Sequence, residues 1–148
     1  MIMNTRILTD NKKTIHTDGK LIYADTTYKV RGCAINVFNE LGNGHKEAVY
    51  QKALEKELIQ QNIPYKKEFS IKVNYKGESI GNYRPDFIID DKIIIELKAV
   101  EFLPVSFEKQ LVHYLKSTEF KLGILINFGA NKLYIKRLIW TGSAKIRK

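Results

Sequence analysis

NYRPDFIIDDKIIIELKAV, from Asn82 to Val100, is the stretch that decides the fold of this 148-residue chain. Two runs of three apolar residues, 87–89 and 93–95, flank the polar residues 90–92. Apolar runs separated by a short polar turn are typical of a β-hairpin. The sequence therefore predicts a hairpin with a polar loop, and the rest of the chain is expected to pack around it.

Three chargeable side chains lie in or beside these apolar runs: Asp86, Glu96 and Lys98. A charge among isoleucines costs desolvation free energy unless a partner or a metal ion compensates it. Because side chains alternate along a strand, Glu96 and Lys98 are expected on the same face. Asp86 faces Glu96 only if residues 90–92 form a loop centred on Asp91, since a shift of one residue would turn Asp86 to the opposite face.

With that register, two carboxylates and an ammonium group meet on one patch of the sheet. Nearby carboxylates repel each other unless a cation joins them or one takes a proton. Mg²⁺ binds through one or two carboxylates and keeps several waters, and it can position an attacking water and stabilise charge on phosphorus. A lysine beside it can orient or help deprotonate that water. The spacing alone also allows a structural pair between lysine and carboxylate on a half-exposed face.

Length and composition describe one globular domain with a net charge of +9 and 44% hydrophobic residues. The charge favours a polyanionic partner, and an ordinary lysine-rich surface is the alternative. No apolar run reaches the roughly 20 residues that a membrane span needs, and the first residues lack the apolar core of a signal peptide. With a single cysteine, Cys33, we expect a cytoplasmic protein without disulfides.

Two helices are predicted before the hairpin. The first follows a cap at Asp25-Thr26-Thr27 and ends at Gly42, and the second runs from about His45 to Gln61. The later elements are three antiparallel strands, a helix beginning at Pro104 and two more strands, with the strands at 66–75, 79–89, 92–100, 121–128 and 132–140. The order α-α-β-β-β-α-β-β predicts an α/β fold around one mixed sheet.

The ends of the chain are harder to interpret. Residues 1–24 form either an N-terminal arm or a small hairpin that turns at Asp18-Gly19. Residues 25–140 form the domain, and residues 141–148 form a basic tail.

The second helix carries an apolar stripe and one acidic residue beside it. The stripe consists of Val49, Tyr50, Ala53, Leu54 and Leu58. Glu47 precedes Tyr50 by three positions and Leu54 by seven, which places its carboxylate on the buried side of the first turn. The alternative is a glutamate favoured there by the helix dipole.

Four short motifs resemble those of known nucleases. Pro85-Asp86 followed by Glu96-Leu97-Lys98 resembles the PD-(D/E)XK nuclease signature. The spacing from Gln110 to Tyr114 is similar to the Q-x-x-x-Y motif of the RecB-like and phage-exonuclease-like branch. The segment from Gly44 to Tyr50 resembles the G-x-x-E-x-x-Y signature of a small bacterial and archaeal family, and so does Asn127-Phe128-Gly129. The resemblance covers about Tyr23 to Trp140.

The resemblance implies a restriction-endonuclease-like core, a mixed sheet flanked by helices with the active site at one sheet edge. It implies Mg²⁺ or Mn²⁺ as the cofactor. It implies that Lys98 is the catalytic lysine. The implied metal ligands are the catalytic acids Glu47, Asp86 and Glu96 and the main-chain carbonyl of Leu97. The residues expected to support the site or bind substrate are Gln110, Tyr114, Tyr50 and Arg84.

The implied function is a metal-dependent nuclease that hydrolyses phosphodiester bonds, with DNA as the favoured substrate and little sequence specificity. The alternative is a non-catalytic nucleic-acid-binding or protein-interaction module of a repair or defence assembly. The chain departs from relatives in its first helix, where Asn36 and Phe38 replace a glutamate and a histidine that they often carry.

Overall fold

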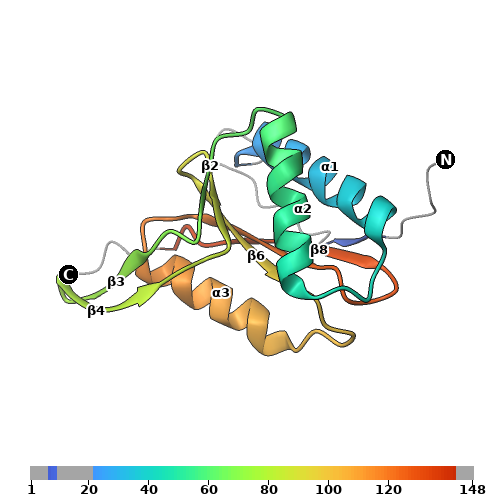
Figure 1. The fold of residues 1–148 in the computed structure, drawn as a ribbon. Helices are drawn as coiled ribbons and strands as arrows, with labels where there is room; N and C mark the ends of the chain where they lie inside the picture. The colour runs from blue at the N-terminus through green and yellow to red at the C-terminus, as the bar shows by residue number, and fades with distance from the viewer. Residues whose placement is uncertain (1–6, 10–21, 143–148) are drawn as a thin grey trace.

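The structure is a computed structural model, and it describes residues 7–9 and 22–142. Its helices are α1 (Ala24–Leu41), α2 (Glu47–Gln60) and α3 (Val105–Ser117). Its strands are β1 (Ile7–Thr9), β2 (Tyr65–Lys67), β3 (Ile71–Tyr75), β4 (Glu78–Tyr83), β5 (Phe87–Ile89), β6 (Ile93–Lys98), β7 (Leu122–Asn127) and β8 (Leu133–Ile139). Six strands form one mixed sheet in the order β1-β8-β7-β6-β5-β2, and β3 pairs only with β4 (Figure 1).

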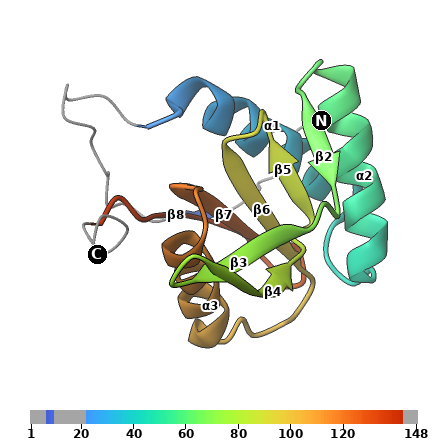
Figure 2. The same ribbon diagram turned by 90° about the vertical axis from the view of Figure 1, so that its left-hand side faces the viewer.

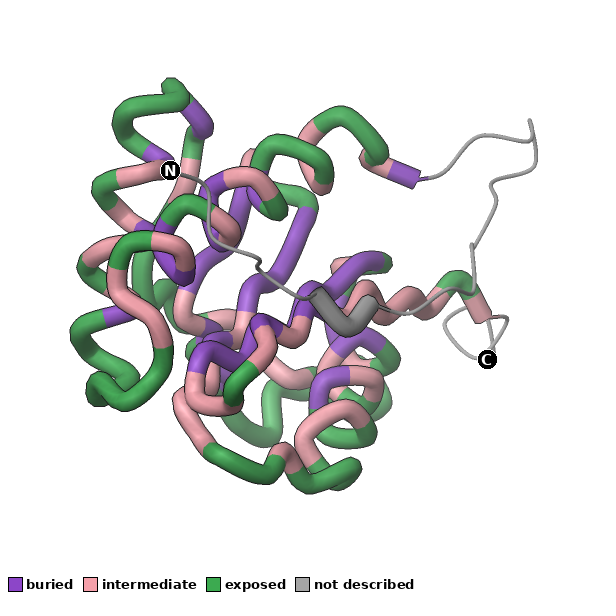
Figure 3. Tube along the Cα trace, turned by 90° about the vertical axis from the view of Figure 1, so that its right-hand side faces the viewer, coloured by how far each residue is buried: buried purple, intermediate pink, exposed green. Residues whose placement is uncertain are grey.

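Helices cover both faces of the large sheet, as predicted for an α/β fold. The helices α1 and α2 pack on one face and α3 on the other (Figures 1 and 2). Strand alternation divides the core accordingly, with Ile93, Ile95 and Leu97 facing α1 and α2 while Ile94 faces α3. Buried residues concentrate in the central strands (Figure 3). No helix in the described ranges has the length and apolar character needed to cross a membrane.

The hairpin of β5 and β6 has the predicted register. Phe87 lies opposite Ile95, and Ile89 lies opposite Ile93, so residues 90–92 form the loop. Asp90 and Asp91 have φ angles of 52° and 53°, a left-handed conformation that aspartate tolerates better than most residues. The amide of Asp90 donates a hydrogen bond to the carbonyl of Pro64 at 2.8 Å, which ties the loop to the end of α2.

The apolar stretch 121–128 forms the central strand that its sequence predicts. All six residues of β7 are buried. It runs parallel to β6 and antiparallel to β8, so the connection from β6 to β7 crosses over through α3. Gly123 lies under this helix, where an added Cβ would meet the side chain of Leu111 at 3.0 Å.

The prediction of continuous strands over residues 66–75 and 79–89 is wrong, because both stretches break. The first stretch breaks at Glu68, which has a φ angle of 51°. It is therefore divided into β2 before the break and β3 after it. The second breaks between Tyr83 and Phe87, where Pro85 cannot donate a hydrogen bond to a neighbouring strand. The separated pieces β3 and β4 form their own hairpin, joined by a turn at Lys76-Gly77.

Several element boundaries also differ from the prediction. The first helix begins at Ala24, so Asp25 lies in its first turn, and Tyr23 occupies the cap without a side-chain hydrogen bond. The helix ends at Gly42 as predicted, with a φ angle of 64°. Pro104 caps α3 instead of being its first helical residue. Val49 is 40% exposed and does not belong to the buried stripe of α2.

The terminal segments are described only in part. The strand β1 pairs parallel to β8, and no sequence pattern predicted it. The predicted turn at Asp18-Gly19 and the tail from residue 143 onward lie outside the described residues.

Candidate functional site

Asp86 and Glu96 meet at the open end of the β5–β6 hairpin, as the predicted register requires. The main-chain amide of Asp86 donates a hydrogen bond to Oε1 of Glu96 at 3.3 Å. The main-chain amide of Leu97 donates one to Oδ2 of Asp86 at 2.7 Å. These reciprocal bonds hold both carboxylates at fixed positions one ladder step beyond the last paired residues.

A second partner of Asp86 comes from α2. Nε2 of Gln51 donates a hydrogen bond to Oδ1 of Asp86 at 3.2 Å. Both carboxylate oxygens of Asp86 therefore accept a hydrogen bond, one from the hairpin and one from the helix. Sequence reasoning missed Gln51, although it directly follows Tyr50, the last residue of the G-x-x-E-x-x-Y segment.

Glu96 is a partly buried acid with a strongly shifted pKa. Burial, followed by the nearby negative charge of Asp86, raises the pKa of Glu96 from 4.5 to about 7. The two carboxylates thus resist carrying two negative charges near neutral pH unless a cation accompanies them. The sequence predicted this repulsion, because it places the carboxylates of Asp86 and Glu96 close together.

Lys98 lies on the α3 face of β6 together with Glu96, as alternation predicts. Its ammonium Nζ lies 4.4 Å from the ring centroid of Phe107 on α3, a cation–π contact. Within the described residues, Lys98 makes no ion pair as short as 4 Å. The structural lysine–carboxylate pair that the spacing allows is therefore not formed there, and the ammonium is available to a substrate.

Glu47 is the first residue of α2, where its carboxylate was predicted on the buried side of the first turn, and the residue as a whole is exposed. Its pKa is nevertheless raised, first because the carboxyl is partly desolvated. The charge of Lys98 lowers this pKa, and the charge of Asp86 raises it further. Glu47 therefore lies within electrostatic range of the hairpin acids, at the margin of the site.

Tyr50 supports the start of α2 from inside the core. Its ring is fully buried and stacks on Phe128, with centroids 4.6 Å apart. Its hydroxyl donates a hydrogen bond to the carbonyl of Gly42 at 2.5 Å and accepts one from the amide of His45 at 3.3 Å. Tyr50 thus fixes the loop that leads into Glu47, and it is placed to support the site, not to bind substrate.

The tyrosine of the Q-x-x-x-Y pattern contacts the site through a second tyrosine. Tyr114 stacks on Tyr83, with ring centroids 3.6 Å apart and planes 6° from parallel. Tyr83 is 5% exposed, and among the described residues its buried hydroxyl has no hydrogen-bond partner of good geometry. The carboxylate of Glu96 is near enough to help raise the pKa of this hydroxyl, after burial itself. Gln110 is exposed on α3.

The chain after Lys98 is clamped by the Asn127-Phe128-Gly129 motif. Oδ1 of Asn127 accepts hydrogen bonds from the amides of Val100 at 3.0 Å and Gly129 at 3.1 Å, and its Nδ2 donates to the carbonyl of Val100 at 2.9 Å. The amide of Phe128 donates to the carbonyl of Lys98 at 2.8 Å. The motif therefore fixes the end of β6, where Lys98 lies.

Sequence reasoning missed Gln51, Tyr83 and the clamping role of Asn127. A buried asparagine at the end of an apolar strand was a usable signal, because buried polar groups require partners. Tyr83 and Gln51 gave no such signal. Of the remaining candidates, Arg84 is exposed, and Leu97 is buried with its amide directed to Asp86.

The chemistry of the acids fits a divalent cation held by two carboxylates. Within residues 22–142, no group of three or more His, Cys, Asp or Glu side chains is arranged to hold a metal ion, so Glu47 does not complete a three-acid cluster. Mg²⁺ commonly uses only one or two carboxylates and completes its shell with water and phosphate oxygens. Asp86 and Glu96, close enough to raise the pKa of Glu96, meet that requirement.

One comparison with known proteins gives a match. A sequence model of the PD-(D/E)XK nuclease superfamily matches residues 24–138, which include every candidate residue. The mixed sheet with helices on both faces is consistent with the restriction-endonuclease-like fold of that superfamily. No curated protein and no solved structure matches the chain.

Proposed function

The chain belongs to the PD-(D/E)XK nuclease superfamily, and we propose that it is a metal-dependent nuclease that hydrolyses phosphodiester bonds in nucleic acid. The observation that carries the proposal is the register of the β5–β6 hairpin. It brings Asp86 opposite Glu96 and leaves Lys98 on the same face, where it makes no ion pair with any residue that the structure describes. Charged groups with only a structural role would be expected to pair with one another. Here the carboxylates of Asp86 and Glu96 stay available to a metal ion, and the ammonium of Lys98 stays available to a substrate.

Each residue has a role that its surroundings support. Asp86 and Glu96 would hold a divalent ion, Mg²⁺ or Mn²⁺, whose positive charge supplies Lewis acidity toward a phosphate oxygen and a nucleophilic water at neutral pH. Gln51 and the amide of Leu97 orient Asp86. The carbonyl of Leu97 and the carboxylate of Glu47 are proposed as further ligands once the ion and substrate are bound.

Lys98 acts on the reacting phosphate or on the attacking water. Its ammonium is held over the ring of Phe107 and not by a carboxylate, so it can donate hydrogen bonds to a phosphate oxygen. Charge that develops on phosphorus in the transition state is stabilised by such a pre-placed donor. Arg84, exposed two residues before Asp86, is proposed to bind a neighbouring phosphate.

DNA is the proposed substrate, and little sequence preference is expected. The net charge of +9 favours contacts to the phosphate backbone, which carry no sequence information. The described fold contains no second domain that would read base edges.

A cleavage panel tests the proposal and identifies the polymer. Purified protein is incubated with single- and double-stranded DNA and RNA of equal length in Mg²⁺, Mn²⁺ or EDTA. Cleavage is expected only with metal, and it should be lost in Lys98→Met, which preserves the length of the stem but not the charge. Cleavage that survives in EDTA, or that Lys98→Met retains in full, would contradict the proposal.

The second candidate is a nucleic-acid-binding module without turnover. The observation that favours it is that Glu47 stays outside the pair of acids, so the described site has two carboxylates and not three. Under this alternative, the folded protein binds nucleic acid in a salt-dependent way but cleaves no polymer in the panel with either metal.

A further inference from the structure

The hairpin of β3 and β4 extends from the body of the protein beside α3 (Figures 1 and 2). It pairs with none of the strands of the large sheet. Its second strand ends at Tyr83, and the chain then runs directly through Arg84 to Asp86. The hairpin is therefore an arm whose root lies at the proposed active site.

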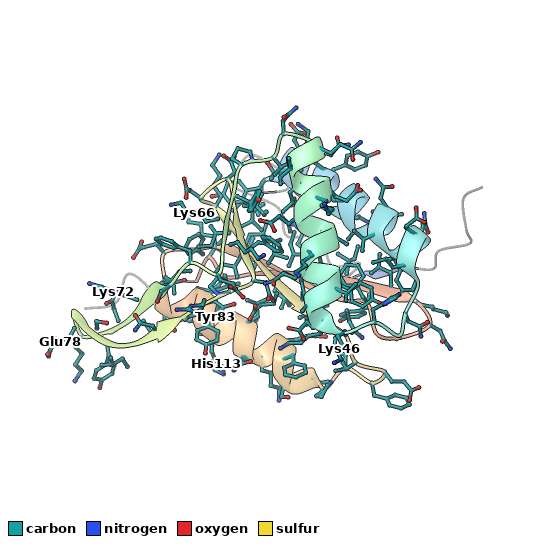
Figure 4. The ribbon with its side chains drawn as sticks, viewed as in Figure 1. Lys46, Lys66, Lys72, Glu78, Tyr83 and His113 are labelled. Atoms are coloured by element: carbon teal, nitrogen blue, oxygen red, sulfur yellow. The ribbon has the colours of Figure 1, made fainter. Side chains whose placement is uncertain are left out.

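The root of this arm is anchored in the core. Ile71 and Val73 pack with Tyr83 against the cluster that includes α3, and Tyr83 stacks on Tyr114. Figure 4 shows Tyr83 between the hairpin and α3. Because its root is packed, the arm starts from a defined position beside Asp86. A β-bulge between Val73 and Asn74 interrupts its register.

From its root to its tip, the arm carries exposed cations with few local partners. Lys72, Lys76 and Arg84 are all exposed, against one acid, Glu78, at the tip. Among the described residues, none of these three cations makes an ion pair within 4 Å. Lys72 and Glu78 lie on the projecting part of the arm, away from α2 (Figure 4).

Apolar and aromatic side chains are exposed between these cations. Tyr75 is 57% exposed and Ile80 is 66% exposed. The ammonium of Lys76 lies 5.4 Å from the ring centroid of Tyr75. Cations interleaved with an exposed aromatic ring are the side chains that bind a sugar-phosphate backbone and its bases. A covered structural hairpin would not be expected to expose them.

We propose that the β3–β4 arm is a substrate-binding element that contacts the nucleic-acid backbone several nucleotides from the bond to be cleaved. This inference rests on the proposed function, because it takes nucleic acid as the substrate. A strand of six residues spans roughly 20 Å, and one strand of duplex DNA carries a phosphate about every 3.4 Å along the axis. Lys72 lies opposite Asn82 near the root of the arm, whereas Lys76 at the far turn reaches phosphates up to about half a helical turn from the site.

The arm also explains how so small a domain holds a long substrate. Arg84 and Lys72 bind close to the acids, and Lys76 binds farther along the same polymer. Contacts to phosphates fix the direction and register of the polymer without selecting its sequence. The arm thus sets the length of substrate that binds well, and short oligonucleotides that end before it should bind weakly.

Binding without cleavage tests the arm separately from the nuclease. The probes are a fluorescein-labelled duplex of 20 base pairs and the matching single strand, titrated in EDTA at several salt concentrations with anisotropy as the readout. The test variant is Lys72→Gln with Lys76→Gln. The control is Lys29→Gln with Arg31→Gln, which removes two exposed charges from α1 on the far side of the large sheet.

The test variant is expected to bind the duplex at least tenfold more weakly at low salt. The slope of log affinity against log salt should fall by about 1.8 for the duplex and about 1.4 for the single strand, and the control should change little. Equal loss in the two variants, or no binding by the wild type, would overturn the inference. Weaker binding by the test variant, together with no cleavage in the panel, would support the arm while the proposed nuclease activity fails.

Discussion

Tyr83 stacks face to face on Tyr114, with ring centroids 3.6 Å apart, and this contact joins α3 to the segment that leads into Asp86. The tyrosine of the Q-x-x-x-Y pattern thus acts on the site through another ring. Tyr83 brings its buried hydroxyl to the side of Glu96, where the two groups affect each other's pKa. The ring stack is therefore a structural support of the acidic pair.

Tyr83→Phe and Tyr83→Ala together separate the contribution of the Tyr83 hydroxyl to stability from that of its ring. The phenylalanine keeps the stack on Tyr114, and the hydroxyl it removes has no hydrogen-bond partner of good geometry among the described residues. We expect the free energy of unfolding to change by less than about 1 kcal/mol. Tyr83→Ala removes the stack and the buried ring, and we expect a loss of about 3 kcal/mol or more. Urea denaturation of both variants measures this, and equal losses would show that the hydroxyl, not the ring, is the stabilising group.

The stability of the metal-free protein should depend on pH through Glu96. The pKa of Glu96 is about 7 in the folded protein, against 4.5 for a glutamate without these interactions, as in the unfolded chain. Between pH 4.5 and pH 7, Glu96 keeps its proton in the folded state but has lost it in the unfolded state. The contribution of Glu96 to stability is therefore greatest below pH 4.5, and it falls as the pH rises to about 7. The loss is at most about 3 kcal/mol. Urea denaturation in EDTA from pH 5 to pH 8 measures it.

Glu96→Gln and added metal provide the controls for this pH dependence. The variant should keep only a small decline, since Glu47, whose pKa is also raised, contributes in the same direction. Saturating Mg²⁺ should stabilise the wild type above pH 7 and leave Glu96→Gln almost unchanged. A wild-type stability that rises from pH 5 to pH 7 in EDTA would contradict the assigned environment of Glu96.

Gln51→Met tests the contact between α2 and the hairpin. Methionine preserves the length of the side chain but removes the hydrogen bond from Nε2 to Asp86. Groups that orient a metal ligand typically contribute ten- to hundredfold to metal affinity or activity, and we expect a loss in that range, measured by calorimetric titration with Mn²⁺. Gln60→Met, at the exposed end of the same helix, is the matched control. Equal affinities in the two variants would show that the Gln51 contact does not matter.

Gly129→Ala tests the clamp that fixes the end of β6. An added Cβ would lie 2.1 Å from the main-chain nitrogen of Val100, so the backbone itself would have to move. We expect a loss of at least about 2 kcal/mol in the free energy of unfolding. Gly81→Ala is the control, because no atom lies within 4 Å of its added Cβ. Thermal and urea denaturation compare the two, and a neutral Gly129→Ala would argue against the clamp.

The central part of the fold was predictable because burial dictates its pattern. The apolar runs that flank residues 90–92 allow one register that keeps the isoleucines inside and places Asp86 opposite Glu96, and this prediction is confirmed. The continuous apolar stretch of β7 likewise predicted a strand covered on both faces. The roles of these acids and of Lys98 in catalysis stay predictions.

The arm and its anchor were not predictable, because alternation does not tell which sheet a strand joins. The stretch 66–75 was predicted as one strand from the alternation of Phe69, Ile71, Val73 and Tyr75, yet Glu68 adopts a left-handed conformation and divides the stretch between two sheets. The position of Tyr83 depends on its stacking with Tyr114, a contact between residues 31 positions apart. Such contacts arise from tertiary packing and leave no periodic signal in the sequence.

The most direct measurement is the single-turnover cleavage rate of Asp86→Asn beside the wild type, on the polymer that the panel identifies, in Mg²⁺ and in EDTA. Asparagine keeps the acceptor for the amide of Leu97 but removes the negative charge. A wild-type rate that requires Mg²⁺, and a rate at least a hundredfold lower in a folded Asp86→Asn, is the predicted result. Equal rates in the two proteins, or a wild-type rate unaffected by EDTA, would contradict a metal-dependent nuclease centred on Asp86 and Glu96.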